Sequence, residues 1–123
     1  MSQSIAIAPP NSLIFIMDYL AGDIPDAIND ALVSSAASCI AVGTLAEFDG
    51  ATTVTLASAM QDVAHLTNVF NGVLDTPSRQ LSICNVKIEV LLFLAGLTER
   101  TNVQVFANDL SEPDQILVVA SSV

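Results

Sequence analysis

Carboxylates gather in two stretches of this 123-residue chain, and these side chains are the most suited to chemistry. The stretches hold Asp18, Asp23, Asp26 and Asp30, and then Asn108, Asp109, Glu112 and Asp114. Oxygen ligands on loops suit Ca²⁺, which binds roughly six to eight of them. Carboxylates on a surface also attract basic partners. A third interpretation is structural, because Asp commonly caps helices and starts turns through its own backbone neighbours.

Other residue types offer little catalytic chemistry. His65 is the single histidine, and its alternating apolar and polar neighbours are typical of a strand or surface residue rather than a general base. The five glycines are isolated, so no phosphate-binding loop is formed, and no Gly-x-Ser-x-Gly motif marks a nucleophile. A glycosidase would need two carboxylates across a cleft, and nothing marks such a pair. We therefore expect a protein that is not an enzyme.

Cys39 and Cys84 both lie inside apolar segments of the sequence. Buried, reduced thiols are the expectation, and a disulfide between facing strands is the alternative. Their spacing excludes a zinc knuckle built on cysteine alone.

The charge is strongly one-sided, with 13 acidic residues against three basic ones and a formal charge of −10. Because 52% of the residues are hydrophobic, the chain is too apolar to be a disordered acidic tail. Arg79, Lys87 and Arg100 are too few to neutralise nucleic-acid phosphates. An acidic surface also repels anionic membranes. We therefore expect a basic protein partner, no nucleic acid and no membrane, with homo-oligomerisation through an apolar face left open.

The length suits a single domain over residues 1–123. The first four residues carry no basic side chain, and Pro9–Pro10 interrupts the apolar run that follows, unlike a signal peptide. The longest apolar run, Val90 to Leu97, has eight residues, whereas a transmembrane helix needs about 20. A cytoplasmic location is the expectation.

Most of the chain shows an apolar pattern of period two with many β-branched residues. The expected strands cover residues 12–18, 38–45, 52–56, 65–70, 80–85, 88–94, 102–107 and 115–120. Asp49-Gly50, between two of these strands, predicts a two-residue hairpin. Asn71-Gly72 predicts either a second hairpin or a β-bulge.

The segment around residues 25–35 departs from this rhythm. Pro25 suits a first helical position, and Asp26 and Asp30 suit the early turns of a helix. The apolar residues that follow at helical spacing are Ala27, Ile28, Ala31 and Leu32. The predicted fold class is all-β: an antiparallel β-sandwich of about 7–9 short strands with one short helix near residues 25–35.

Several segments follow one another along the chain in an order that can be compared with known proteins. They are a strand ending in Asp18, Ile24-Pro25-Asp26, residues 42–45, Asp49-Gly50, residues 74–78, 80–83 and 101–106, and Ser111-Glu112-Pro113-Asp114. This order resembles small bacterial β-sandwich proteins of the competence-associated nuclease inhibitor (competence protein J) type. Here Ala, Ser and small aliphatic residues replace aromatic and charged residues common in those proteins, so no functional residue is carried over. The resemblance implies a non-enzymatic sandwich that binds and restrains a partner such as a nuclease.

The leading hypothesis is an acidic inhibitor or immunity-type protein that masks a basic partner such as a nuclease, whose active site holds phosphates with Lys and Arg. The predicted partner-binding residues are Asp18, Asp23, Asp26 and Asp30 on one side and Asp109, Glu112 and Asp114 on the other, provided that both loops share one end of the sandwich. The alternatives are a calcium-binding β-sandwich module that uses the same loops, and a structural homo-oligomeric subunit. Apart from calcium in that alternative, no cofactor is expected.

Overall fold

The computed structural model describes residues 2–25 and 31–123, which form ten strands and one 3₁₀ turn, η1 (Pro10–Ser12). The strands are β1 (Ser2–Ile7), β2 (Leu13–Met17), β3 (Val33–Ser35), β4 (Cys39–Gly43), β5 (Thr52–Ala57), β6 (Thr67–Asp75), β7 (Leu81–Cys84), β8 (Val90–Leu94), β9 (Arg100–Ala107) and β10 (Gln115–Ser122). No helix in the described part of the chain has the length and hydrophobicity that crossing a membrane requires.

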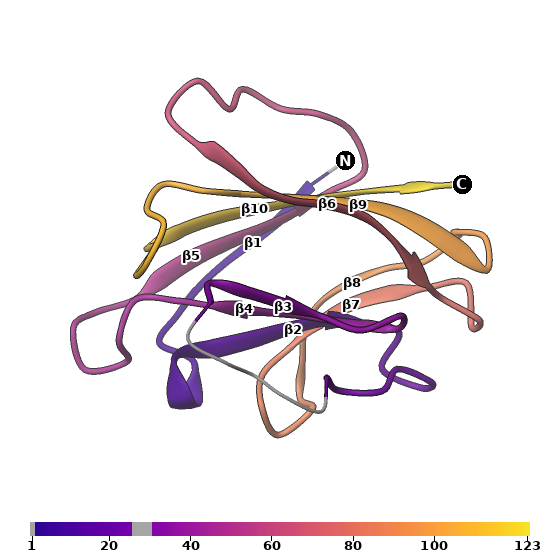
Figure 1. Cartoon of the computed structure of the whole chain (residues 1–123), viewed down its shortest axis with the longest axis horizontal. Coiled ribbons are helices and arrows are strands. Elements are labelled where there is room, and N and C mark those ends of the chain that lie inside the picture. Colours follow the sequence, from indigo (N-terminus) through magenta and orange to yellow (C-terminus); the bar gives the residue numbers. More distant parts are fainter. Residues whose placement is uncertain (1, 26–30) are drawn as a thin grey trace.

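The strands form two five-stranded sheets that lie one over the other (Figure 1). The first sheet has the order β1-β5-β10-β9-β6, and the second has the order β3-β4-β2-β7-β8. The pairing of β10 with β5 is parallel, whereas the other pairings among the described residues are antiparallel. The structure therefore confirms the predicted β-sandwich.

The main core lies between the sheets and follows from the period of two along each strand. Alternate residues of β2 and β4 point inward and are buried. Alternate residues of β5, β9 and β10 are buried in the same way. Buried members of this core include Ile14, Ile16, Ile40, Val42, Val54, Leu56, Val103, Val105, Ile116 and Val118.

Two smaller apolar clusters cover parts of the outer faces of the sheets. One contains Phe15, Met17, Cys39, Ala41 and Cys84 on the second sheet. The other contains Ala57, Phe106, Leu117 and Val119 on the first sheet, against which the segment before β6 packs Val63 and Leu66. Burial on both faces explains why β2 is apolar throughout and β10 is apolar from Ile116 to Ala120.

The predicted helix near residues 25–35 is wrong at its C-terminal end. Val33–Ser35 form strand β3, in which Val33 pairs with Val42 of β4 and packs against the main core. Pairing with a buried strand overrides the helical spacing of the local sequence, since intrinsic propensity is a weak determinant. The residues that carried most of that prediction, 26–30, lie outside the described residues.

The predicted Asp49-Gly50 hairpin is also wrong. These residues do form a turn, in which the Asp49 backbone N–H donates to the Ala46 carbonyl at 2.8 Å and Gly50 has a φ of 134°. However, the strands on either side, β4 and β5, belong to different sheets. The turn residues fix the local backbone but do not fix which strand the chain pairs with next.

The remaining strands match the predicted segments, apart from β1 and β3, for which no strand was predicted. Asn71-Gly72 is not a hairpin but continues β6. The irregularity in that strand lies slightly earlier, between Asn68 and Phe70.

Candidate functional site

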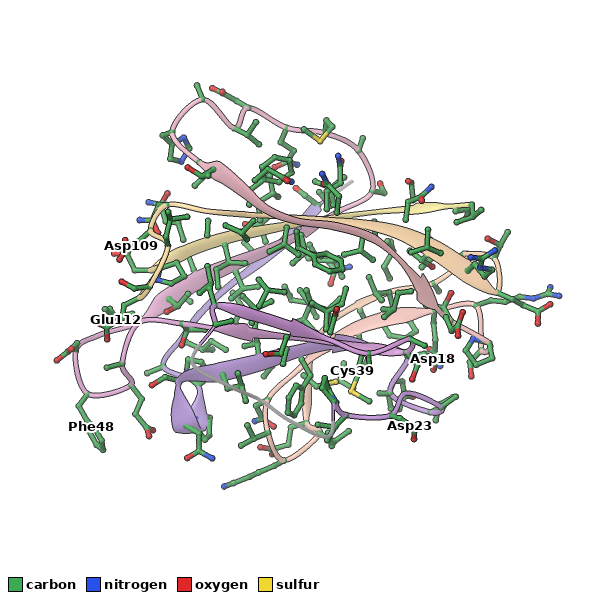
Figure 2. All side chains as sticks on the ribbon, viewed as in Figure 1. Asp18, Asp23, Cys39, Phe48, Asp109 and Glu112 are labelled. Atoms are coloured by element: carbon green, nitrogen blue, oxygen red, sulfur yellow. The ribbon has the colours of Figure 1, made fainter. Side chains whose placement is uncertain are left out.

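The two acidic stretches lie at opposite ends of the sandwich. Figure 2 shows Asp18 and Asp23 at one end and Asp109 and Glu112 at the other. Asp18 directly follows β2, whereas Asp109 and Glu112 lie on the loop between β9 and β10. The structure therefore does not bring the two predicted loops together. Asp26 and Asp30 lie outside the described residues.

Asp18 is fully buried and serves the fold. Its Oδ1 accepts a hydrogen bond from the Leu20 N–H at 3.1 Å, and its Oδ2 accepts one from the Ser78 N–H at 2.6 Å. These bonds close the turn after β2 and attach it to the loop before β7. A carboxylate enclosed in this way is not available to a partner surface. Asp23 is exposed, and its backbone N–H donates to Ser38 Oγ at 2.8 Å.

The loop between β9 and β10 is ordered by its own polar side chains. The Asp109 carboxylate accepts hydrogen bonds from the Leu110 and Glu112 N–H groups at 2.9 and 3.2 Å. Asn108 Oδ1 accepts bonds from the Asp114 and Gln115 N–H groups, both at 3.1 Å. The turn-forming role of Asp and Asn is thus present here. It fixes the loop without burying its carboxylates, because Asp109, Glu112 and Asp114 are exposed.

The loop between β4 and β5 joins the same end. The Leu45 N–H donates to the Pro113 carbonyl at 2.8 Å, and the Thr53 N–H donates to the Asp114 carbonyl at 2.8 Å. The loop that carries Glu47 and Asp49 therefore lies at the same end of the sandwich as the predicted carboxylates, as the place of Phe48 in Figure 2 also shows. We define the acidic end as Glu47, Asp49, Asp109, Glu112 and Asp114.

Two large apolar side chains are exposed within the acidic end. Phe48 is 93% exposed and projects from the tip of its loop, as Figure 2 shows, and Leu110 is 66% exposed on the neighbouring loop. Sequence reasoning missed Phe48, Glu47 and Asp49, because it assigned their segment to a hairpin. The signal that could have found them is Phe48, an aromatic residue between the acids Glu47 and Asp49 at a predicted turn.

The arginines lie away from the acidic end. Arg79 approaches Glu99 at 3.8 Å, in the region of the Asp18 turn, and Arg100 begins β9 opposite Asp75 of β6. Lys87 occupies the turn between β7 and β8. The two arginines therefore lie opposite the five carboxylates, whereas the Lys87 turn lies at the end where β2 begins, because Cys84 pairs with Phe15.

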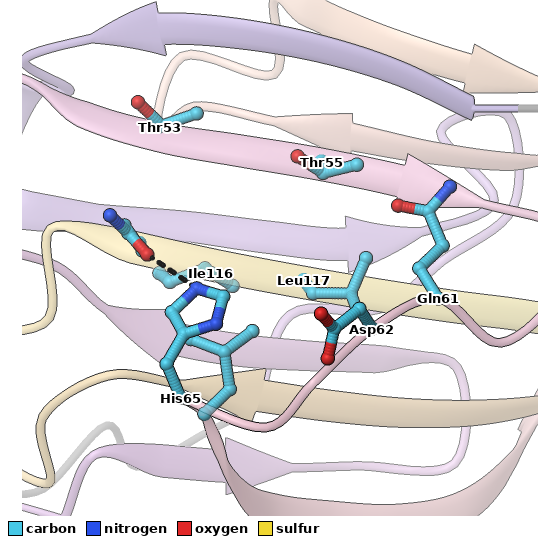
Figure 3. Close-up of a pocket in the computed structure, with 9 residues that line it drawn as sticks. Thr53, Thr55, Gln61, Asp62, His65, Ile116 and Leu117 are labelled. Atoms are coloured by element: carbon cyan, nitrogen blue, oxygen red, sulfur yellow. Dashed lines mark hydrogen bonds between the residues drawn. The ribbon is translucent and has the colours of Figure 1, made fainter.

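A small polar pocket of about 200 Å³ lies on the outer face of the first sheet (Figure 3). It is lined by Thr53 and Thr55 of β5, by Gln61, Asp62, His65 and Leu66 before β6, and by residues 115–117 of β10. His65 Nε2 donates to Gln115 Oε1 at 3.0 Å, and Asp62 Oδ1 accepts a bond from the Ala64 N–H at 3.1 Å. Thr53 and Thr55 supply the hydroxyl groups of this lining, and Thr55 Oγ1 is paired with Ser4 Oγ at 2.8 Å.

The cysteines are free and buried on the outer side of the second sheet, as expected from the sequence. Cys39 lies on β4 and Cys84 on β7, with β2 between these strands. Burial raises the pKa of the Cys39 thiol to about 12, with a smaller contribution from Cys84, and burial raises the pKa of Cys84 to about 11.

Metal ligands are not assembled in the part of the chain that the structure describes. Within residues 2–25 and 31–123, no three His, Cys, Asp or Glu side chains are grouped so as to hold a metal ion. In the acidic end, both Asp109 oxygens already accept hydrogen bonds from the loop.

Comparisons with known proteins found a similar solved structure. No protein-family model matches the chain, and no curated protein sequence matches it. Among solved structures it is similar to ComJ from Bacillus subtilis, described as an inhibitor of the DNA-degrading activity of NucA. The match has a TM-score of 0.69 and covers 100% of this chain and 96% of ComJ, at 10% sequence identity. The chain shares the fold of ComJ. The resemblance expected from the sequence is therefore confirmed at the level of the fold.

Proposed function

We propose that this chain is a non-enzymatic acidic binding protein of the inhibitor or immunity type, which masks a basic partner such as a nuclease. The observation that carries the proposal is the match to ComJ over the whole chain, since ComJ is an inhibitor of the DNA-degrading activity of NucA. The charge of −10 supports the same function, because it favours a partner with a positive surface.

The acidic end is the proposed binding surface. A nuclease holds phosphates with Lys and Arg, and a surface that presents carboxylates at a similar density can occupy the same groove. Of the residues predicted from the sequence, Asp109, Glu112 and Asp114 keep this role, and Glu47 and Asp49 join them. Asp18 is buried, and Asp23 lies at the opposite end.

The acidic end is also fixed in shape before any partner arrives. The hydrogen bonds of Asp109 and Asn108 order one loop, and the bond from Leu45 to Pro113 attaches the other loop to it. A surface that is already ordered loses little conformational entropy on binding. Opposite charges on the two partners would in addition speed association, and salt would slow it.

The test is inhibition of DNA degradation by Bacillus subtilis NucA with the purified chain at low and high salt. We expect inhibition that weakens as salt is added. The double variant Asp49→Asn/Glu112→Gln is expected to slow association roughly tenfold at low salt. A matched control, Asp23→Asn/Glu99→Gln, removes the same two charges at the other end and is expected to inhibit like the wild type. Absence of inhibition by the wild-type chain would contradict the proposed function.

A further inference from the structure

Phe48 lacks the cover that a side chain of its size normally has in a folded protein. It is 93% exposed, more than any other large hydrophobic residue in the described part of the chain. Leu110, on the loop that Leu45 holds in place through Pro113, is 66% exposed. Single exposed apolar residues are common, but these two lie on loops that the bond from Leu45 to Pro113 joins.

The turn that carries Phe48 is held on both sides. The Asp49 N–H donates to the Ala46 carbonyl at 2.8 Å, which closes the turn around Phe48. The Glu47 N–H donates to Ser12 Oγ at 2.9 Å, and Glu47 Oε1 accepts a bond from the Asn11 N–H at 3.3 Å. The backbone at Phe48 is thus tied to η1 as well as to its own loop, so the ring is presented from a fixed position.

The surroundings of these apolar side chains are acidic. Glu47 and Asp49 flank Phe48 in the sequence, and Asp109 directly precedes Leu110. An apolar centre within a polar rim is the arrangement of a binding hot spot, in which aromatic residues fill pockets of the partner. Here the rim carries only negative charge, which favours a partner with a positive surface.

We propose that Phe48 is the apolar anchor of the acidic end and inserts into an apolar pocket bordered by Lys and Arg on a basic protein. Leu110 contacts the edge of that pocket. The assignment rests on the function proposed above and specifies the partner further: a positive surface is not sufficient, and an apolar pocket beside it is required.

A second copy of this chain does not fit the same surface in a symmetric, face-to-face dimer. Two acidic ends brought face to face would set Glu47, Asp49 and Glu112 of one copy against the same carboxylates of the other. Like charges across an interface are strongly unfavourable. Arg79 and Arg100, which could neutralise them, lie at the opposite end of the sandwich.

The test measures association and dissociation rates with immobilised NucA for the wild type, Phe48→Ser and the control Leu20→Ser. Leu20 is 64% exposed in the turn after Asp18, so the control makes a similar surface change at the other end. We expect Phe48→Ser to raise the dissociation rate about 30-fold while the association rate and its salt dependence stay unchanged. Leu20→Ser should match the wild type, and equal melting temperatures would exclude misfolding of either variant.

The outcomes separate the two proposals. If Asp49→Asn/Glu112→Gln slows association but Phe48→Ser dissociates like the wild type, the acidic inhibitor stands and the anchor is overturned. If Phe48→Ser also lowers the association rate as strongly as the charge variant, Phe48 has no distinct anchoring role. If the wild type does not bind NucA, both proposals are overturned.

Discussion

The side-chain amide of Gln3 binds both backbone polar groups of Phe93, which lies 90 residues away in the sequence. Gln3 Nε2 donates to the Phe93 carbonyl, and Gln3 Oε1 accepts a bond from the Phe93 N–H at 3.3 Å. Gln3 lies on β1 and Phe93 on β8, which are edge strands of different sheets. The amide therefore closes one side of the sandwich and occupies polar groups on an edge that could otherwise pair with another chain.

Replacing Gln3 should weaken this closure. Gln3→Ala removes two hydrogen bonds to backbone, and we expect a loss of about 1–2 kcal/mol in the free energy of unfolding. It also frees the outer edge of β8, so self-association should increase. Urea unfolding and sedimentation velocity measure the two effects. Gln61→Ala, at an exposed loop position, is the matched control, and equal behaviour of the two variants would contradict the role of Gln3.

Asp18 should act on stability and not on partner binding. Asp18→Ala removes the acceptor of the Leu20 and Ser78 N–H groups, and we expect a loss of about 1–3 kcal/mol. The measurement is chemical unfolding, with Asp23→Ala as the exposed control. A variant that kept its stability but lost binding to NucA would instead support the partner-binding role predicted for Asp18 from the sequence.

The thiols give a pH dependence of stability whose sign can be worked out. The pKa of a cysteine thiol is ordinarily 9.0, and burial raises it to about 12 in Cys39 and about 11 in Cys84. Below about pH 8 both thiols are protonated in the folded and unfolded chains, so they add almost no pH dependence. Between pH 9 and 11 the unfolded chain loses these protons while the folded chain keeps them, so stability falls as the pH rises.

The measurement is urea unfolding of the wild type and of Cys39→Ala/Cys84→Ala at pH 8, 9.5 and 10.5. The decline with pH should be shallower in the double variant, because other alkaline titrations are common to both proteins. A thiol reagent at pH 8 should react slowly with the folded wild type and quickly after unfolding. Identical pH slopes for both proteins would show that the thiols titrate alike in the folded and unfolded chains.

Much of the fold could be predicted because burial leaves a direct trace in the sequence. The unbroken apolar run of β2 indicates that both faces of the strand are buried. Ile16 packs in the core between the sheets, and Phe15 packs in the cluster on the outer face. Pairing partners leave no such trace. Asp49-Gly50 marks a turn equally well whether the next strand joins the same sheet or the opposite one. For β3, contact with Val42 decided against a helix, and that contact is not visible in the local residues.

The candidate site was predictable only in part for the same reason. Asp109 and Glu112 are visible in the sequence because they cluster in one loop. Their neighbours Asp49 and Phe48 are about 60 residues away and join them through the bond from Leu45 to Pro113. Conversely, Asp18 was grouped with Asp23 by proximity in the sequence, whereas the fold buries one and exposes the other.

Calcium should have no specific effect on the described acidic loops. The oxygens of Asp109 accept hydrogen bonds from the Leu110 and Glu112 N–H groups. Within residues 2–25 and 31–123, no three His, Cys, Asp or Glu side chains are grouped so as to hold a metal ion. We therefore expect millimolar CaCl₂ to raise the melting temperature no more than NaCl of equal ionic strength, which screens repulsion among the carboxylates. Differential scanning calorimetry with chelator, CaCl₂ and NaCl makes the comparison. A larger rise with CaCl₂ that disappears in Asp109→Asn would favour the calcium-binding alternative, because a ligand that binds the folded chain stabilises it.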